Sequence, residues 1–159
     1  MNAVVAVYSD WGIGCGGTQP LVVKADRKHF REVTGSGAVI VGRKTLADFP
    51  GGKPLKGRRN IVLTRQTLDI PGAETAADVS EACAKTQNEA EVFVIGGESV
   101  YRAMLPHLTR VFVTKIDAQP VSDVFFPNLD ADESWQITER SGLLEEDGLQ
   151  YEFLTYERK

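Results

Sequence analysis

Short apolar runs rich in β-branched residues alternate with segments of helical spacing through the first two-thirds of the chain. The short runs predict buried strands, and apolar positions three or four residues apart predict amphipathic helices. Strands are expected at residues 3–8, 38–41, 60–64, 91–95, 110–116, 135–141 and 151–157. Helices are expected at residues 25–33, from 42–45 onward, at 78–85 with Asp78 as the cap, and at 98–105 before Pro106.

The order of these elements predicts an α/β fold. Strands that alternate with helices imply parallel pairing, with helices on both faces of the sheet. The strands beyond residue 110 lack intervening helices, which indicates antiparallel strands at one edge, the last two joined by a long hairpin. We therefore expect a mixed, mostly parallel central sheet with flanking helices and an antiparallel C-terminal edge. The length of 159 residues, without repeats or linkers, predicts a single domain over residues 1–159.

Composition narrows the classes of protein that fit. With 42% hydrophobic and 25% charged residues, the chain is typical of a globular protein. A net charge of −4 argues against binding to nucleic acid or to an anionic membrane. Two cysteines and two histidines disfavour a disulfide scaffold, a metal site and a histidine-based triad. The apolar run at 3–8 is too short for a targeting segment and lacks a basic lead, so we expect a cytoplasmic protein without a membrane span.

Groups suited to an anion follow three of the predicted strands, where ligands bind in open α/β sheets. The first site is Gly42 with Arg43, Lys44 and Thr45, at a predicted helix start. Gly42 lets the backbone approach a ligand closely, and N–H groups at a helix start attract anions. The two cations oppose the helix dipole, a conflict that a bound anion would relieve. The alternative is an ordinary basic helix start on the surface.

The second site is the Gly96-Gly97 pair between Ile95 and Glu98, where a strand passes into a helix. Paired glycines can present backbone N–H groups to a pyrophosphate, and a tight structural turn is the alternative. The spacing is not the three-glycine dinucleotide fingerprint. Gly97-Glu98-Ser99 begins like the nucleophile elbow of a hydrolase, but Tyr101 replaces the closing glycine, which argues against that class.

The third site is Leu63-Thr64-Arg65, whose hydroxyl and guanidinium suit a phosphate monoester, with a solvated surface arginine as the alternative. Three such sites along one sheet edge fit a dinucleotide that carries an additional phosphate, which describes NADP. The distribution of charge agrees with an anionic ligand. Residues 41–66 hold seven Lys or Arg and one acid, Asp48, so this segment carries +6 and the rest of the chain −10.

One carboxylate stands out as a candidate for proton chemistry. Asp26 follows a glycine-rich loop at residues 9–24 and lies four residues before Phe30 on the same predicted helix face. A partly buried carboxylate can accept two hydrogen bonds from an amidine-like edge, and burial raises the pKa of a carboxyl. The alternative is an ordinary first-turn aspartate that faces the helix dipole.

Taken in order, these residues resemble the dihydrofolate reductase family over nearly the whole chain. The order and spacing of the motifs are specific together, although none is decisive alone. The motifs are Trp11-Gly12-Ile13-Gly14, Asp26 with Phe30 and Thr34, Val41-Gly42-Arg43-Lys44-Thr45, Pro54-Leu55, Gly57-Arg58-Arg59-Asn60-Ile61, Ile95-Gly96-Gly97 with Tyr101, and Thr114, Asp117, Asp123 and Phe126-Pro127. The resemblance implies an NADPH-dependent oxidoreductase that transfers a hydride to C6 of 7,8-dihydrofolate, with protonation at N5, to give 5,6,7,8-tetrahydrofolate.

The resemblance also implies roles for individual residues. Asp26, supported by Thr114, would bind the pterin through N3 and the 2-amino group and promote protonation of N5. Arg58 would pair with the α-carboxylate of the glutamate tail. The implied substrate-binding residues are Val4, Val5, Asp26, Phe30, Phe49, Leu55, Arg58, Ile95 and Thr114.

The implied NADPH site draws on all three strand ends. Arg43, Thr64 and Arg65 would hold the adenosine 2′-phosphate, and Lys44 and Thr45 the pyrophosphate. The implied cofactor-binding residues are Ala6, Ile13, Gly14, Gly42, Arg43, Lys44, Thr45, Leu63, Thr64, Arg65, Gly96, Gly97, Glu98, Ser99, Val100 and Tyr101. No metal ligand is implied, and we expect a monomer that binds dihydrofolate and antifolate inhibitors.

The chain departs from the family pattern at a few positions. Leu21 and Leu46 stand where tryptophans are usual, and Arg27 follows Asp26 where an apolar residue is common. Cys15-Gly16-Gly17 makes the active-site loop glycine-rich.

Two rival functions are a pyrimidine reductase of riboflavin synthesis and a non-catalytic nucleotide-binding protein. Asp26 and Arg58 argue against the first, because a ribityl-phosphate substrate needs neither group in those places. Oxidation of NADPH that depends on dihydrofolate would exclude the second.

Overall fold

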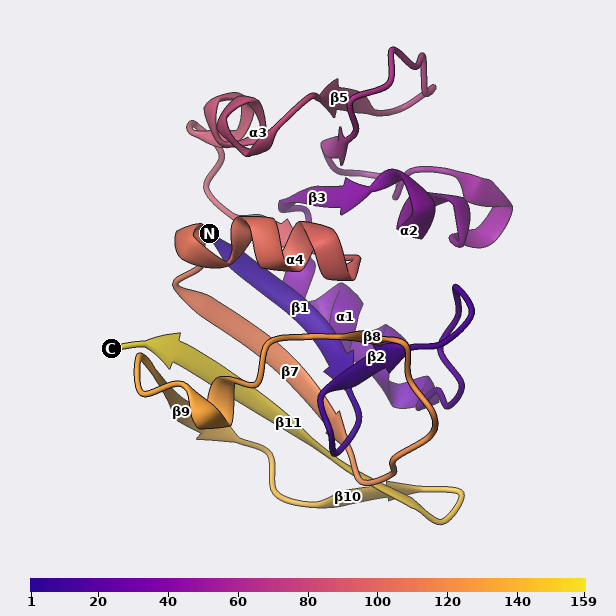
Figure 1. Cartoon of the computed structure of the whole chain (residues 1–159), viewed down its shortest axis with the longest axis vertical. Helices are drawn as coiled ribbons and strands as arrows, with labels where there is room; N and C mark the ends of the chain where they lie inside the picture. Colours follow the sequence, from indigo (N-terminus) through magenta and orange to yellow (C-terminus); the bar gives the residue numbers. More distant parts are fainter.

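The computed structural model describes all 159 residues, and a nine-stranded sheet dominates it (Figure 1). The strands of this sheet are β1 (Asn2–Val7), β3 (Ala38–Gly42), β4 (Asn60–Leu63), β5 (Glu74–Ala76), β6 (Val92–Val94), β7 (Arg110–Ile116), β9 (Trp135–Arg140), β10 (Leu144–Glu146) and β11 (Leu149–Arg158). Eight of them follow the spatial order β10-β11-β7-β1-β6-β3-β4-β5, and β9 pairs with β11. A separate ribbon pairs β2 (Gly12–Gly14) with β8 (Val124–Phe125).

Strand directions confirm the mixed sheet predicted from the sequence. Every neighbouring pair from β7 to β5 is parallel. Strand β11 runs antiparallel to β7, β9 and β10, which makes the C-terminal edge antiparallel. Parallel neighbours bring the carboxyl ends of β1, β3, β4, β6 and β7 to one edge of the sheet, where ligands bind in folds of this kind.

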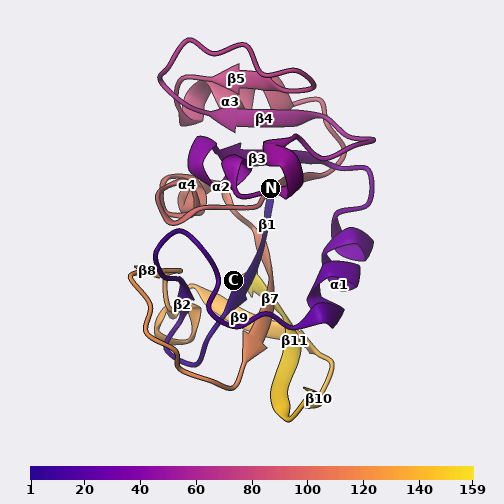
Figure 2. The same ribbon diagram turned by 90° about the vertical axis from the view of Figure 1, so that its right-hand side faces the viewer.

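Helices lie on both faces of the sheet (Figure 2). They are α1 (Lys24–Thr34), α2 (Arg43–Ala47), α3 (Val79–Thr86) and α4 (Glu98–Met104), with short 3₁₀ turns at Pro50–Gly52, Leu105–His107 and Leu129–Ala131. Figure 2 shows α1 on one face of the central strands, and α4 with the β2–β8 ribbon on the other. No helix has the length and apolar character needed to cross a membrane.

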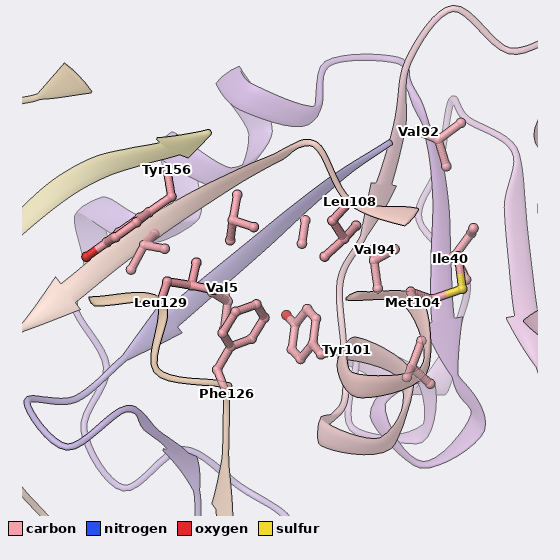
Figure 3. Close-up of a cluster of buried hydrophobic side chains, with 14 of the residues drawn as sticks. Val5, Ile40, Val92, Val94, Tyr101, Met104, Leu108, Phe126, Leu129 and Tyr156 are labelled. Carbon is pink, nitrogen blue, oxygen red and sulfur yellow. The ribbon is translucent and has the colours of Figure 1, made fainter. Parts of the chain in front are cut away.

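The alternation of side chains along β1 divides the core between the two faces. Val5 belongs to a large cluster on the α4 face, where it joins Tyr101 and Phe126 (Figure 3). Its neighbour Val4 belongs to a second cluster on the α1 face, against which Phe30 packs. Both valines are 6% exposed, so β1 is covered on both sides, as its uninterrupted apolar sequence requires.

The expected elements are present, with small shifts at their ends. Asp78 caps α3, because its carboxylate accepts the N–H of Glu81 at 2.8 Å. Helix α4 ends at Met104, and Pro106 lies in the 3₁₀ turn that follows. The sequence pattern missed β2, β5, β8 and β10, each of two or three residues, because such short strands are defined by their partners rather than by local periodicity. Strand β10 lies within the expected long hairpin between β9 and β11.

Candidate active site

The three predicted anion sites lie side by side because β6, β3 and β4 are consecutive strands of the sheet. Gly42, at the end of β3, is the register partner of Leu63, at the end of β4. The N–H of Gly42 donates to the carbonyl of Gly96 at 2.8 Å, which connects β3 to the turn after β6. Motifs far apart in the chain therefore meet at one edge.

The Gly96-Gly97 turn packs directly on Thr45. A Cβ added to Gly97 would lie 2.9 Å from Oγ1 of Thr45, and one added to Gly96 would lie 3.2 Å from its Cγ2. Gly96 also has a φ of +131°, a conformation that favours glycine, and the peptide bond that joins the two glycines is cis. Space therefore requires glycine at position 97, and the positive φ favours it at position 96.

Three cations at this edge are free of protein partners. Arg43, Lys44 and Arg65 are exposed, and none of them takes part in an ion pair or a side-chain hydrogen bond within the chain. Arg59 behaves differently, since it pairs with Glu74 and Glu89 and donates to the carbonyl of Lys85. The three unpaired side chains are therefore the ones available to a phosphate-bearing ligand.

Thr64 and Leu63 lie beside these cations. The N–H of Thr64 donates to the carbonyl of Ala76 at 2.9 Å, which holds the end of β4 against β5. The hydroxyl of Thr64 accepts the N–H of Gln66 at 3.2 Å and remains half-buried. A hydroxyl in this position can still donate to an anion, because it uses only its acceptor capacity within the chain.

Asp26 lies in the first turn of α1, on the face of the sheet that α1 covers. The hydroxyl of Thr114, from β7, donates to its Oδ1 at 2.5 Å. Burial raises the pKa of Asp26 above its ordinary value, while the hydrogen bond from Thr114 and the nearby imidazole of His29 act in the opposite direction. Asp26 forms no ion pair with a Lys or Arg, so its carboxyl is suited to proton chemistry rather than to a structural salt bridge.

A residue that the sequence did not indicate holds the start of α1. Val23, at the N-cap position, provides no side-chain cap. Instead, the carboxylate of Glu146, at the end of β10, accepts the N–H of Lys24 at 2.6 Å and that of Ala25 at 3.1 Å. This contact joins positions more than 120 residues apart and fixes the turn that carries Asp26. No local sequence motif predicts this contact, because the capping carboxylate comes from a distant hairpin.

Half-buried apolar side chains lie on α1, the helix that carries Asp26, and on the β3–β4 connection. Phe30, Phe49 and Leu55 pack on the cluster that contains Val4 and Ile95, yet each is only half-buried. Their remaining free surface can contact an aromatic ligand. Val4 and Ile95 are more than nine-tenths buried, so they support this surface from below.

Arg58 is oriented by the end of α1 and keeps an unused donor. Its Nη1 donates to Oγ1 of Thr34 at 2.6 Å, and that hydroxyl donates to the carbonyl of Phe30 at 2.8 Å. Its Nε is buried and has no partner. Burial also lowers the pKa of Arg58. Nη2 makes no hydrogen bond within the chain, so it remains as a donor for a carboxylate.

Several of the predicted cofactor residues lie deeper than their sequence positions suggest. Tyr101 is 4% exposed, and its hydroxyl donates to the carbonyl of Val4 at 2.6 Å. Burial raises the pKa of Tyr101 far above its ordinary value, so the phenol stays protonated. Val100, and Val5 among the predicted substrate contacts, face the core cluster under α4, which leaves only their main chains for ligand contact. Ala6 and Ile13 are half-buried, while Ser99 is exposed.

Two carboxylates near the site accept backbone hydrogen bonds from distant segments of the chain. Glu98, at the start of α4, accepts the N–H of Phe125 at 2.6 Å, which joins α4 to β8. Asp123 accepts the N–H of Gly16 at 3.0 Å, which holds the tip of the glycine-rich loop. Sequence motifs contain both acids, but neither pairing can be inferred from spacing alone.

The family-atypical residues have distinct environments. Leu21 is 38% exposed, and its backbone N–H and carbonyl both bond to the hydroxyl of Tyr8. Arg27 is exposed on α1, whereas Leu46 is 4% exposed and packs within the cluster on the α1 face. Gly14, one of the predicted cofactor residues, is the buried last residue of β2.

Comparisons of the sequence with a family model and with individual proteins agree on one family. The sequence model of the family described as Dihydrofolate reductase matches residues 1–158. The dihydrofolate reductase of Mycobacterium leprae is 38% identical over 152 residues, which cover 92% of this chain and 90% of that protein. The dihydrofolate reductase of Neisseria meningitidis serogroup B is 36% identical, and the match covers 99% of this chain and 98% of that protein. The dihydrofolate reductase of Rattus norvegicus is 35% identical, and the match covers 100% of this chain and 97% of that protein.

Proposed function

Because the chain belongs to the dihydrofolate reductase family of oxidoreductases, we propose that it reduces 7,8-dihydrofolate to 5,6,7,8-tetrahydrofolate with NADPH as the hydride donor. The observation that carries this proposal is the placement of Asp26. Its carboxyl is partly buried, hydrogen-bonded to Thr114 and free of any ion pair, and it lies one helical turn before the half-buried Phe30 on α1. Such a group can hold a heterocycle by hydrogen bonds and exchange a proton with it.

Asp26 is the catalytic residue in this proposal. Its carboxylate accepts hydrogen bonds from N3 and the 2-amino group of the pterin, and this pairing promotes protonation of N5. Thr114 holds the carboxyl in place and leaves its second oxygen free for the ligand. Phe30, Phe49 and Leu55 contact the ring systems, with Val4, Val5 and Ile95 supporting the pocket through their main chains or buried side chains.

The three strand ends form the proposed NADPH site. Their fit to a phosphorylated dinucleotide rests on the unpaired Arg43, Lys44 and Arg65 and on a glycine turn that a Cβ would obstruct. Arg43, Thr64 and Arg65 would hold the 2′-phosphate, and Lys44 and Thr45 the pyrophosphate. NADPH supplies the hydride when it is bound; the chain supplies alignment, a proton and exclusion of water.

Ala6, Ile13 and Tyr101 surround the proposed nicotinamide position. Ala6 is the register partner of Thr114, which places it on the rung of the sheet that contacts Asp26. The reacting ends of the two ligands would therefore meet near the carboxyl ends of β1 and β7. The remaining proposed cofactor contacts are Gly14, Gly42, Leu63, Gly96, Gly97, Glu98, Ser99 and Val100.

Arg58 is proposed to bind the α-carboxylate of the glutamate tail. Thr34 occupies Nη1 and Nε is buried, so Nη2, which makes no hydrogen bond within the chain, is the donor that would meet the carboxylate. A ribityl phosphate would not need a carboxyl acceptor at Asp26, and this arrangement favours dihydrofolate over the substrate of a pyrimidine reductase. We further propose a single-domain, monomeric cytoplasmic enzyme that also binds antifolates.

The test is oxidation of NADPH by the purified chain with and without dihydrofolate. The expected result is consumption of NADPH that requires dihydrofolate and yields tetrahydrofolate in equal amount. Binding of NADPH without any turnover would support the rival non-catalytic nucleotide-binding protein. Turnover with a pyrimidine substrate and none with dihydrofolate would instead support the other reductase.

A further inference from the structure

One titratable side chain beside the site has no part in the proposed reaction: His29. It lies three residues after Asp26 on α1, a spacing that places both side chains on neighbouring parts of one helix face. Its ring stacks on Phe153 of β11, with centroids 3.8 Å apart and planes inclined by 16°. The imidazole is therefore held in one place by an aromatic contact.

The residues that contact His29 and Asp26 are paired with each other in the sheet. Phe153 pairs directly with Thr114 across the β11–β7 ladder, so their side chains point to the same face of the sheet. Thr114 holds the carboxyl of Asp26, and Phe153 holds the imidazole of His29. Two adjacent residues of the sheet thus fix the two titratable groups next to each other.

Other charged groups around His29 come from α1, β9, β10 and β11. On α1, Glu32 lies one turn further along and pairs with Lys28 at 3.8 Å. On β9, Glu139 and Arg140 line a surface cavity of about 250 Å³ together with His29 and Phe153, and Arg140 pairs with Glu152 of β11 at 3.5 Å. On β10, Glu146 caps the start of α1. Asp26 differs from Glu32 and Glu152 because no Lys or Arg pairs with it.

Burial lowers the pKa of His29, and the carboxylates of Asp26 and Glu32 oppose that effect. The cavity beside the ring keeps the imidazole accessible to water, so it can exchange protons with solvent.

We propose that His29 is a positioning residue that controls the protonation of Asp26, with the two groups titrating as one coupled pair. Charged His29 favours the carboxylate form of Asp26. Once His29 is neutral, the carboxyl retains a proton more readily. The consequence for the reaction rate rests on the proposed function, whereas the coupling itself does not.

The direct test is NMR titration of the ligand-free protein. The chain has only two histidines, His29 and His107, so two imidazole signals are expected and His107→Gln assigns them. Asp26→Asn is expected to move the His29 midpoint to lower pH, because it removes a carboxylate that favours the charged ring. His29→Phe, which preserves a stacked ring, is expected to move the Asp26 carboxyl midpoint to higher pH. His107→Gln should leave the His29 and Asp26 midpoints unchanged.

A second variant, His29→Gln, repeats the carboxyl measurement without an aromatic ring and covers the case in which His29→Phe packs poorly. A His29 midpoint that does not respond to Asp26→Asn would overturn the inference. So would an Asp26 midpoint that is unchanged in both His29 variants.

The rate measurement separates this inference from the proposed function. In both His29 variants, the pH at which dihydrofolate-dependent oxidation of NADPH declines is expected to move upward with the Asp26 midpoint. Coupled titration in a protein that never reduces dihydrofolate would contradict the proposed function and leave the coupling intact. Normal reduction with independent titrations would contradict only the role of His29.

Discussion

The contact between Glu146 and α1 predicts that a distant hairpin stabilises the helix that carries Asp26. In Glu146→Ala, the N–H groups of Lys24 and Ala25 lose their acceptor, and no side chain at Val23 can replace it. Loss of a helix cap costs about 1 kcal/mol, and loss of a negative charge near the helix N-terminus costs about 0.5 kcal/mol more. For a chain of this size, about 1.5 kcal/mol corresponds to a fall in Tm of roughly 3–6 °C.

Thermal and urea unfolding followed by circular dichroism measure this loss. Glu145→Ala is the matched control, because Glu145 is on the same short strand, is exposed and makes no side-chain hydrogen bond or ion pair in the chain. Glu146→Gln keeps an amide oxygen as acceptor but removes the charge, so its stability should fall between those of Glu146→Ala and the parent. Equal stabilities of Glu146→Ala and Glu145→Ala would refute the argument.

Three further predictions test other parts of the site. Removal of one cation in Arg43→Ala or Arg65→Ala should reduce the preference for NADPH over NADH about tenfold, since one charged hydrogen bond contributes about 1.5 kcal/mol; unchanged KM ratios in both variants would place the 2′-phosphate elsewhere. Gly97→Ala should lower the free energy of unfolding by about 1–3 kcal/mol because its Cβ meets Thr45 at 2.9 Å, and adding Thr45→Ala should recover most of that loss in urea unfolding. Because burial raises the pKa of Asp26, the folded protein loses stability as pH rises from the ordinary aspartate value to the raised one. Asp26→Asn should therefore be more stable than the parent at neutral pH and lose that advantage in acid, and a pH-independent difference would contradict the raised pKa.

The positions of the three anion-binding motifs at strand ends could be predicted from the sequence. Hydrophobic patterning placed the three motifs at the ends of separate strands, and the sheet order β6-β3-β4 confirms that they are neighbours. The alternation of strands with helices, and the lack of helices between strands after residue 110, were also enough to predict the mixed sheet. These features follow from local periodicity and from general rules of βαβ connection.

Features that depend on long-range pairing could not be predicted in this way. The carboxylate of Glu146 bonds to α1 across 122 residues of sequence, and Glu98 meets Phe125 across 27 residues. The contact of His29 with Phe153 depends on the register of β11 against β7. Likewise, the pattern of β1 indicated a buried strand but not that Val5 would face away from Asp26.

The role of Asp26 is the central claim, and Asp26→Asn tests it most directly. The measurement is the rate of dihydrofolate-dependent oxidation of NADPH as a function of pH, with NADPH affinity and the far-ultraviolet spectrum as controls for folding. We expect normal cofactor affinity, loss of most turnover at neutral pH, and partial recovery in acid, where the substrate takes up its own proton. Near-parental turnover at neutral pH would contradict the account.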